Sequence, residues 1–501
     1  MNERTIGIGL SYFNMIIQTI TNFIYIPILL FYMGQSEYGL YQLMGSIIAY
    51  FSVMDFGLTS STIRSYIKYK TKNDPRKLEN FLAMTQRIYK IICLITLLIG
   101  GSIFFSLENI FKNSLTSNEL ISAKYIFLLL LFNMIITFLG MIYRSIIIAN
   151  EKFLFMKGIE SIQLILQPFV VIAVMQVQPT ALAMVFVMTI INIIMTIIRV
   201  YYCYKKIKVE IFYMYWDTEA FREMKTLALS VFVVTIVDQI FWKTNQIILG
   251  IISGTAIVAV YSISSLIYMN YMTLSTTISG IYLPKITKMV AQNISETQLS
   301  NEFLRIGRLQ YYLLALVFSG FLVFGKEFII LWTNENFVDA YYITLIIIAP
   351  FTINLIQNIG NCIMQAKNVY NFRAYVYVGV GILNILLAIP MAKYYGAIGC
   401  AVASGISLFI SNGPIMNWFF RKYLKINIKL FWNQIIKITF YVILCVLFGY
   451  ILNYILGIGN ISLLLLKIAL YTLFYLLIMW NMSFNADEKL LFYRLKNKIN
   501  L

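Results

Sequence analysis

Fourteen apolar stretches of membrane-spanning length divide this chain of 501 residues, and they restrict its possible folds more than any other feature. A helix needs about 20 mostly apolar residues to cross the hydrocarbon core of a bilayer. The stretches lack the alternating ten-residue pattern of a membrane barrel. We therefore expect an all-α polytopic membrane protein with about 14 transmembrane helices. The predicted spans are roughly 6–33, 39–63, 88–106, 124–148, 158–177, 180–202, 227–252, 256–283, 309–331, 341–366, 374–392, 396–419, 435–456 and 461–481.

The composition excludes most soluble and metal-dependent classes of protein. Only 12% of the residues are charged, against about 25% in soluble domains. The first apolar run is too long for the core of a signal peptide, and no small-residue cleavage site follows it, so we expect a retained helix. The chain has no histidine, and its five cysteines are widely spaced. We therefore expect no disulfide framework, no metal site and no cofactor.

The basic residues are distributed asymmetrically between the two predicted sides of the membrane. The net charge of +18 would be compatible with nucleic-acid binding. However, 33 of the 39 Lys and Arg residues fall on the side of the termini and five on the opposite side, which leaves Lys243 within the membrane. The positive-inside rule then places both termini in the cytoplasm. We expect the bases to contact membrane lipids, and we expect no nucleic acid as a partner.

A weak internal repeat indicates two lobes of six helices each. Residues 34–41 resemble residues 254–261, and residues 149–153 resemble residues 366–370, at similar offsets. The offset covers an even number of spans, so the two copies have the same orientation and the substrate path is expected between them. The predicted parts are an N-lobe (1–205), a cytoplasmic connector (206–226), a C-lobe (227–420), and two further helices with a cytoplasmic tail (421–501).

Short motifs along these spans resemble those of Wzx-type polysaccharide flippases. This family belongs to the multidrug/oligosaccharidyl-lipid/polysaccharide (MOP) exporter superfamily. The motifs are Gly34-x-x-x-Tyr38-Gly-Leu-Tyr41, Asp55-Phe-Gly57-Leu-x(5)-Arg64, Ala149-Asn-Glu-Lys152, Ala366-Lys367, and Tyr395-Gly-Ala-Ile-Gly399-Cys-Ala-Val-Ala-Ser404.

The resemblance implies a transporter rather than an enzyme. Its substrate would be a polyprenyl-diphosphate-linked oligosaccharide, which alternating access would move across the bacterial cytoplasmic membrane during biosynthesis of O-antigen or another surface polysaccharide. An association with the polysaccharide polymerase machinery is also implied.

Polar side chains recur at helical spacing on several spans, so that each set forms one stripe on an apolar helix. Because polar groups in hydrocarbon need partners, the stripes should face inward. We expect them to line a hydrated cavity for sugars, and the alternative is hydrogen bonding between helices. The candidates are Asn14, Gln18 and Asn22 on the first span, Asn133 on the fourth, Gln163 on the fifth, and Asn354, Asn358 and Asn361 on the tenth.

A diphosphate requires positive charge, and three bases are candidates to supply it: Lys243, Arg144 and Arg64. Lys243 lies near the middle of the seventh span, and its alternative role is to pair with an acid. Arg144 could instead form a structural ion pair, for example with Asp55. Asp55 and Asp238 are the candidates for binding a coupling ion, either H⁺ or Na⁺.

Two other functions fit the sequence less well than a flippase. A cation-coupled multidrug exporter of the same superfamily would need buried carboxylates, of which the spans contain few. A membrane enzyme, such as a sugar polymerase or ligase, would need acid–base groups or bases at the outer surface. The outer loops are short and carry few bases, and histidine is absent.

Overall fold

The computed structural model describes residues 3–486 and 488–490, and in these residues the secondary structure is helical. The helices are α1 (Glu3–Ala49), α2 (Leu58–Thr71), α3 (Pro75–Phe111), α4 (Ser117–Ala149), α5 (Phe153–Met175), α6 (Ala181–Tyr202), α7 (Thr218–Ile252), α8 (Thr255–Ala291), α9 (Glu296–Trp332), α10 (Asp339–Ile356), α11 (Asn358–Ala366), α12 (Asn371–Ile410), α13 (Met416–Lys422), α14 (Ile428–Leu456) and α15 (Ile461–Ile478). Short 3₁₀-helices at Tyr50–Asp55 and Glu335–Phe337 extend or join these helices. Short π-helices do the same at Cys203–Ile207, Ser411–Ile415 and Met479–Ser483.

The helices confirm an all-α membrane protein with about 14 crossings. Eleven stretches of the described chain are long and apolar enough to span a bilayer. Two of them, Phe13–Thr71 and Asn371–Lys422, are long enough for two crossings each. They turn at Gly34 (φ 76°) and Gly396 (φ 55°), where a left-handed backbone suits glycine. With α7, whose 35 residues are also sufficient, the crossings number 14.

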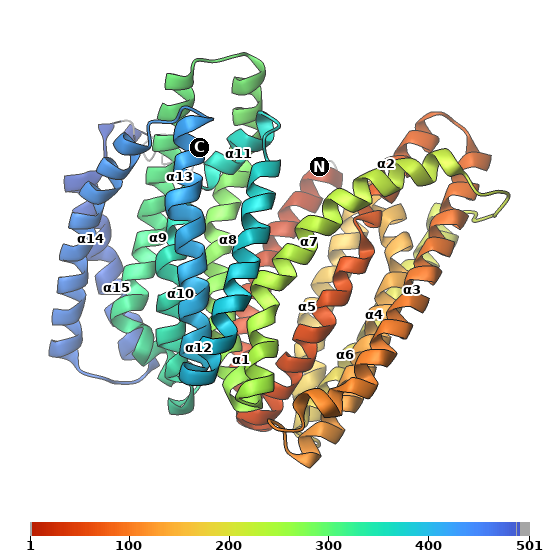
Figure 1. Ribbon diagram of the computed structural model, residues 1–501, viewed down its shortest axis with the longest axis horizontal. Helices are drawn as coiled ribbons and strands as arrows, with labels where there is room; N and C mark the ends of the chain where they lie inside the picture. Colours follow the sequence, from red (N-terminus) through yellow and green to blue (C-terminus); the bar gives the residue numbers. More distant parts are fainter. Residues whose placement is uncertain (1–2, 487, 491–501) are drawn as a thin grey trace. The chain divides into compact units, whose positions relative to one another are not determined.

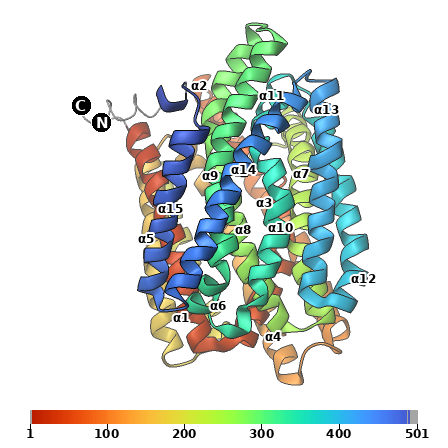
Figure 2. The same ribbon diagram turned by 90° about the vertical axis from the view of Figure 1, so that its left-hand side faces the viewer.

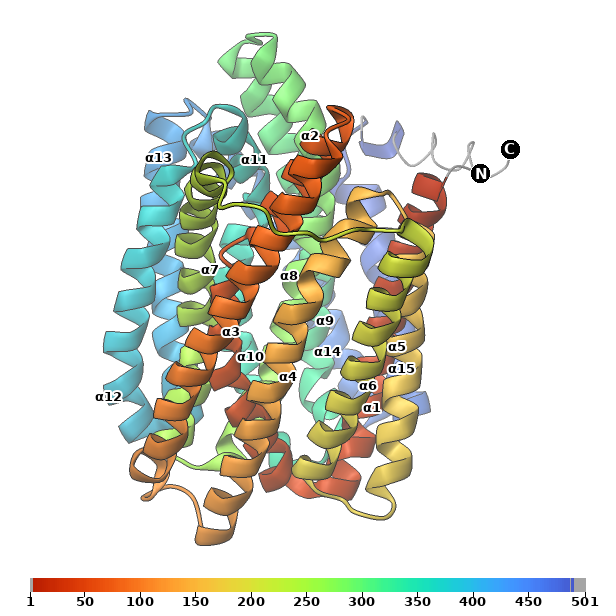
Figure 3. The same cartoon turned by 90° about the vertical axis from the view of Figure 1, so that its right-hand side faces the viewer.

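Packing divides the chain into two compact units, Met1–Ser262 and Ile263–Leu501. In the first unit α1 packs along α5 and against α7, and α4 packs against α3 and α6 (Figures 1 and 3). In the second unit α9 contacts α10, α14 and α15, and α10 packs along α12 (Figure 2). The predicted boundaries of the lobes stay a prediction, and the part of the predicted tail beyond residue 490 lies outside the described residues.

The internal repeat is visible in the backbone. Left-handed residues recur at four pairs of positions with the two offsets that the sequence suggested. An L-residue other than glycine rarely adopts this conformation, so its recurrence at matching positions reflects a duplicated structure. The pairs are Gly34 with Gly254, Asn73 with Asn293, Glu151 with Asn368, and Lys208 with Lys425. The fold is therefore a parallel pseudo-repeat of six helices, followed by two C-terminal crossings.

The connector between the two repeats is anchored to the N-terminal part of α3 (Figure 3). Asn80 Oδ1 accepts hydrogen bonds from the backbone N–H groups of Met214, at 2.8 Å, and Tyr215, at 3.0 Å. The guanidinium of Arg87 lies 3.2 Å from the ring centroid of Tyr213. The connector therefore follows the surface of the first unit before α7 begins.

Gly39 allows α1 to approach the start of α8 within the first unit. A Cβ at Gly39 would lie 1.9 Å from the carbonyl oxygen of Thr255, whereas a Cβ at Gly45 would meet nothing within 4 Å. Because the obstacle is backbone, we expect Gly39→Ala to lower the free energy of unfolding by about 3 kcal/mol, at the upper end for overpacking. Gly45→Ala on the same helix should leave stability unchanged or raise it slightly. Thermal unfolding of the purified variants checks this, and equal melting temperatures would contradict it.

Candidate functional site

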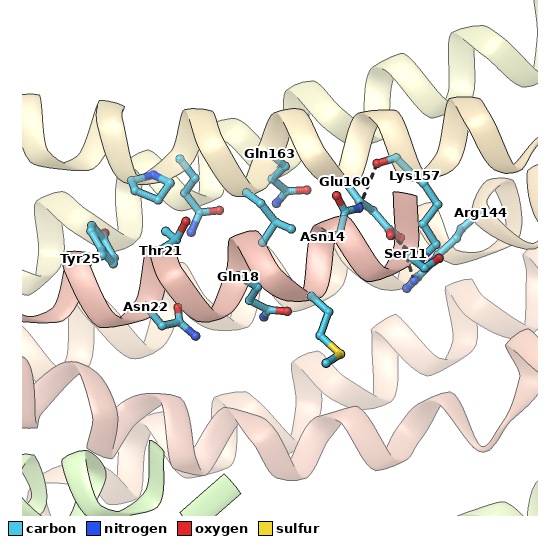
Figure 4. A pocket seen from close by; sticks show the side chains of 14 residues that line it. Ser11, Asn14, Gln18, Thr21, Asn22, Tyr25, Arg144, Lys157, Glu160 and Gln163 are labelled. Atoms are coloured by element: carbon cyan, nitrogen blue, oxygen red, sulfur yellow. Dashed lines mark hydrogen bonds and ion pairs between the residues drawn. The ribbon is translucent and has the colours of Figure 1, made fainter. Parts of the chain in front are cut away.

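A polar cavity of about 540 Å³ lies along α1 and α5 in the first unit (Figure 4). Its residues come mainly from one face of α1 and one face of α5, with one arginine from α4. They are Ser11, Asn14, Met15, Gln18, Thr21, Asn22, Tyr25, Arg144, Lys157, Glu160, Gln163, Leu164, Gln167 and Pro168. The volume is in the range of small-molecule binding sites.

Helical periodicity explains why the α1 amides meet in this cavity. Asn14, Gln18 and Asn22 are spaced by four residues, so they share one face of α1. Asn14 is buried and also joins the two helices. Its Nδ2 donates to the carbonyl of Lys157 at 3.1 Å, and the hydroxyl of Ser161 donates to its Oδ1 at 2.6 Å. One member of the stripe therefore holds α1 against α5, while the next two line the cavity.

Four amides along the cavity are available to a ligand. The side-chain amides of Gln18, Asn22, Gln163 and Gln167 form no hydrogen bond with the part of the chain that the structure describes. Each amide offers both donors and acceptors. Proline at position 168 has no N–H, so the carbonyl of Leu164 loses its usual helical donor one turn earlier. The wall of the cavity is therefore rich in unused hydrogen-bonding groups.

Charged side chains gather at one end of the cavity (Figure 4). They belong to the turns of α4 and α5 that are nearest the loop between these helices. Glu160 lies 3.2 Å from Arg144 Nη2 and 2.7 Å from Lys157 Nζ. The chain reverses between α4 and α5 within residues 150–152, which brings the last turns of α4 level with the first turns of α5. Two bases thus share one carboxylate, and this trio has a net positive charge.

Tyr25 lies toward the other end of the cavity (Figure 4). Its hydroxyl oxygen is buried and has no hydrogen-bond partner among the described residues. A buried hydroxyl without a partner loses the free energy of its hydrogen bonds to water. The tyrosine therefore contributes an aromatic ring to the wall of the cavity.

Asp55 and Arg64 lie outside this cavity. Asp55 ends the short helical turn at Tyr50–Asp55, where the second crossing breaks before α2. Its Oδ1 accepts from the hydroxyl of Tyr89, at 2.9 Å, and from that of Thr59, at 3.1 Å. Arg144 is paired with Glu160, so the ion pair weighed between Asp55 and Arg144 is replaced by another. Arg64 is exposed on α2.

Asn133 forms hydrogen bonds between helices, which was the alternative for the stripes. Asn192 of α6 donates from its Nδ2 to Asn133 Oδ1 and, at 3.0 Å, to the hydroxyl of Thr137. These bonds join α4 to α6. Asn133 does not line the cavity along α1 and α5.

The asparagines of the tenth span belong to the second unit, around the break between α10 and α11. Asn354 donates to the hydroxyl of Tyr377 at 3.3 Å, and Asn361 Nδ2 donates to Asn358 Oδ1 at 2.7 Å. Asn354 and Asn361 are buried, and Asn358 is partly buried. Their role in substrate binding stays a prediction.

Lys243 and Asp238 are partly buried on α7 in the first unit. Lys243 forms no ion pair or hydrogen bond with the described residues. Asp238, in contrast to Lys243, has a hydrogen-bonding or electrostatic interaction within the chain. A base within an apolar helix that is left without a protein partner is a candidate for binding an anion.

Three charged groups of this region were not singled out from the sequence: Lys157, Glu160 and, on α6, Arg199. The predicted fifth span began after Lys157, so this lysine was assigned to a loop. A signal was nevertheless present, because Lys157, Glu160, Gln163 and Gln167 follow one another at intervals of three, three and four. This spacing extends the amide stripe of α5 into the charged end of the cavity.

The chain matches the family model described as "Polysaccharide biosynthesis protein" over residues 7–290, which is more than half of its length. No curated protein matches the sequence significantly. The chain is similar in structure to a protein described as "Lipid II flippase MurJ, inward closed conformation", with a TM-score of 0.72 and 18% identity. The match covers 95% of this chain and 98% of that one.

Two structures of multidrug transporters, in different conformations, share the fold with lower TM-scores. An inward-facing "multidrug resistance MATE family transporter of the MOP superfamily" has a TM-score of 0.63 at 10% identity, covering 81% of this chain and 95% of that one. An outward-facing form has a TM-score of 0.56 at 12% identity, covering 84% and 96%. These structural neighbours are described as a flippase and as multidrug transporters, and the likeness shows that this chain shares their fold. The chain therefore belongs to the polysaccharide biosynthesis protein family.

Proposed function

We propose that this protein is a flippase that moves a polyprenyl-diphosphate-linked oligosaccharide from the cytoplasmic to the outer leaflet of the bacterial cytoplasmic membrane by alternating access. The observation that carries the proposal is the cavity along α1 and α5, which joins an amide-lined wall to a cationic end. The product would serve the biosynthesis of a surface polysaccharide. This agrees with the family to which the chain belongs.

The chemistry of the cavity suits the head group of such a lipid. Sugar hydroxyls both donate and accept hydrogen bonds, and the unused amides of Gln18, Asn22 and Gln163 can do the same. The ring of Tyr25 can lie against the apolar face of a sugar. Arg144 and Lys157 supply positive charge for the phosphates. The polyprenyl tail can remain in the bilayer while the head group crosses.

The position of the charged end agrees with loading from the cytoplasm. It lies beside the α4–α5 loop, which the distribution of basic residues assigns to the cytoplasmic side together with both termini. An anionic head group in the inner leaflet would therefore meet Arg144 and Lys157 first. The sugars would then extend along the amide-lined wall toward Tyr25.

A multidrug exporter is not favoured as an alternative. Such a carrier binds lipophilic cations, which require net negative charge in the cavity. The charged end has two bases for one carboxylate. This excess of positive charge would repel cationic drugs and attract an anionic lipid.

Asp55 and Asp238 remain our candidates for binding the coupling ion, H⁺ or Na⁺. Asp55 lies at a helix break within a crossing, and irregular backbone at this depth is tolerated where it is buried in protein or lines a water-filled cavity. Association with the polysaccharide polymerase and with anionic membrane lipids is part of the same proposal. Arg64 and the asparagines of the tenth span are proposed to contact the substrate elsewhere along its path.

Lys243 gives a prediction in which stability and transport change in opposite directions. A charge near the centre of a membrane helix costs about 2.5–3.5 kcal/mol on insertion scales. If Lys243 is retained to bind phosphate, Lys243→Met should raise the melting temperature and reduce polysaccharide export. If it has a structural partner, the same change should lower the melting temperature. Thermal unfolding and export are both measured on the variant, and full export would remove its proposed role.

Reconstitution tests the proposed function directly. The full-length protein is inserted into vesicles with a polyprenyl-diphosphate oligosaccharide that carries a fluorescent sugar. Dithionite, which does not cross the membrane, then reports how much of the label reaches the outer leaflet. We expect labelled lipid to become accessible faster than in protein-free vesicles. Unchanged accessibility, combined with transport of cationic dyes by the same vesicles, would favour the exporter.

A further inference from the structure

A second arginine stands beside the charged end of the cavity. Arg199 lies in the last turn of α6, a helix that runs in the same direction as α4 because one hairpin separates them. The two helices come close at Gly140, where a Cβ would lie 3.0 Å from Thr196 Cγ2. Arg144 and Arg199 each follow this contact by one turn. They therefore lie at the same level on facing sides of α4 and α6.

The positive charge around Arg199 is not balanced by the described contacts. Its Nε is buried and has no hydrogen-bond partner among the described residues. It lies within electrostatic reach of Arg144 and Glu160. Glu160 already pairs with Arg144 and Lys157. Asp55, which also lies within electrostatic reach of Arg144, is held instead by hydrogen bonds from the hydroxyls of Tyr89 and Thr59. The four groups at the end of the cavity therefore carry a net charge of +2.

A ligand with two negative charges would neutralise this cluster. A diphosphate that bridges a lipid and a sugar carries two negative charges at neutral pH, one on each phosphate. Its oxygens can accept from several N–H groups at once, and the planar guanidinium groups of Arg144 and Arg199 suit this geometry. Monoanions would leave half of the excess charge in place. The cluster is therefore matched to a diphosphate rather than to a single charged group.

We propose that Arg144, Lys157 and Arg199 bind the diphosphate of the lipid-linked substrate, and that Glu160 competes with it for the bases. This inference rests on the proposed function and assigns a role to Arg199, Lys157 and Glu160. The carboxylate keeps the attraction moderate, because a transported group must be released as well as bound. Glu160 would pair with Arg144 and Lys157 again when the head group leaves.

The proposed role of Glu160 predicts that its replacement will raise the affinity for diphosphate, whereas most changes in a binding site lower the affinity. If Glu160 competes with the ligand, Glu160→Gln should bind diphosphate more tightly and transport the lipid more slowly. If Glu160 only stabilises the fold, the same change should weaken binding or destabilise the protein. A gain in affinity cannot result from misfolding. The variant therefore separates the two roles even if it is less stable.

The experiment measures binding of inorganic pyrophosphate to the full-length protein in nanodiscs, by calorimetry at fixed ionic strength. We expect Glu160→Gln to tighten binding about tenfold and Arg199→Gln to weaken it about tenfold or more, as for hydrogen bonds to charged groups. Arg199→Lys should recover part of the loss because it restores the charge. Lys124→Gln is the matched control, since it removes one positive charge from α4 at its opposite end.

The outcomes distinguish this inference from the proposed function. Unchanged affinity in Arg199→Gln, or weaker binding in Glu160→Gln, would overturn the assignment. If the wild-type protein still flips the labelled lipid in vesicles, the function stands and the diphosphate binds elsewhere. If pyrophosphate binds as expected and no lipid-linked sugar is flipped, the anion site stands and the function fails. Competition by dimethyl phosphate, which carries a single negative charge, as strong as that by pyrophosphate would also contradict the match to a diphosphate.

Discussion

Replacing Arg144 with glutamine is expected to reduce polysaccharide export at least about tenfold, because one hydrogen bond to a charged group is lost from the proposed diphosphate site. The guanidinium lies 3.2 Å from Glu160, and its side chain is 45% exposed. The protein should remain folded, since an ion pair this exposed contributes little to stability. Surface polysaccharide and the lipid-linked intermediate are measured together. The intermediate should accumulate as the surface polymer falls.

Lys124→Gln is the control for this prediction. Lys124 lies on the same helix, pairs with Glu108 at 2.7 Å, and does not line the cavity. The substitution removes one positive charge, as Arg144→Gln does, but leaves the charged end of the cavity unchanged. Export should therefore stay close to the wild-type level. Wild-type export from Arg144→Gln, at equal amounts of protein, would show that this arginine does not bind the substrate.

Replacing Lys467 with methionine is expected to destabilise the second unit strongly. Lys467 of α15 is fully buried, and its Nζ lies 2.7 Å and 3.0 Å from the carboxylate oxygens of Glu327 on α9. It also donates to Asn453 Oδ1, at 2.9 Å, and to the carbonyl of Gly457. Removing one partner of a buried ion pair leaves the other charge buried without compensation. The expected loss is about 3–5 kcal/mol.

The double variant Lys467→Met with Glu327→Leu controls for this effect. It removes both charges, so that the buried site becomes apolar and no charge is left unpaired. We expect its melting temperature to recover most of the loss caused by Lys467→Met. Unfolding of both variants in detergent checks the prediction. A double variant as unstable as the single one would show that the ion pair does not explain the stability.

Helical periodicity in the sequence was sufficient to predict one wall of the cavity. Asn14, Gln18 and Asn22 repeat every fourth residue, and Gln163 lies on the adjoining face of α5. A polar face on an apolar helix must point toward protein or water. Periodicity alone did not separate these two environments. The structure places Gln18 along a cavity and Asn133 in a hydrogen bond between α4 and α6.

The charged partners could not be predicted from local sequence. Glu327 and Lys467 are 140 residues apart, and only the packing of α15 on α9 brings them together. The sequence assigns Lys467 to the outer bases, and this assignment does not reveal that its side chain is buried against Glu327. Arg199 had the same ambiguity, because a base near the end of a span usually extends toward the membrane surface. Its significance comes from the contact between Gly140 and Thr196.

The cavity along α1 and α5 is the centre of this account, and photo-crosslinking in cells tests it most directly. A photoreactive amino acid is placed at Gln163, which lines the cavity, or at Phe105, a 79% exposed residue of α3. The adducts are analysed for the lipid-linked glycan after illumination. We predict glycan-bearing adducts at Gln163 in clear excess over those at Phe105. Equal yields at the two positions, or adducts at Phe105 alone, would contradict the assignment of this cavity to the head group.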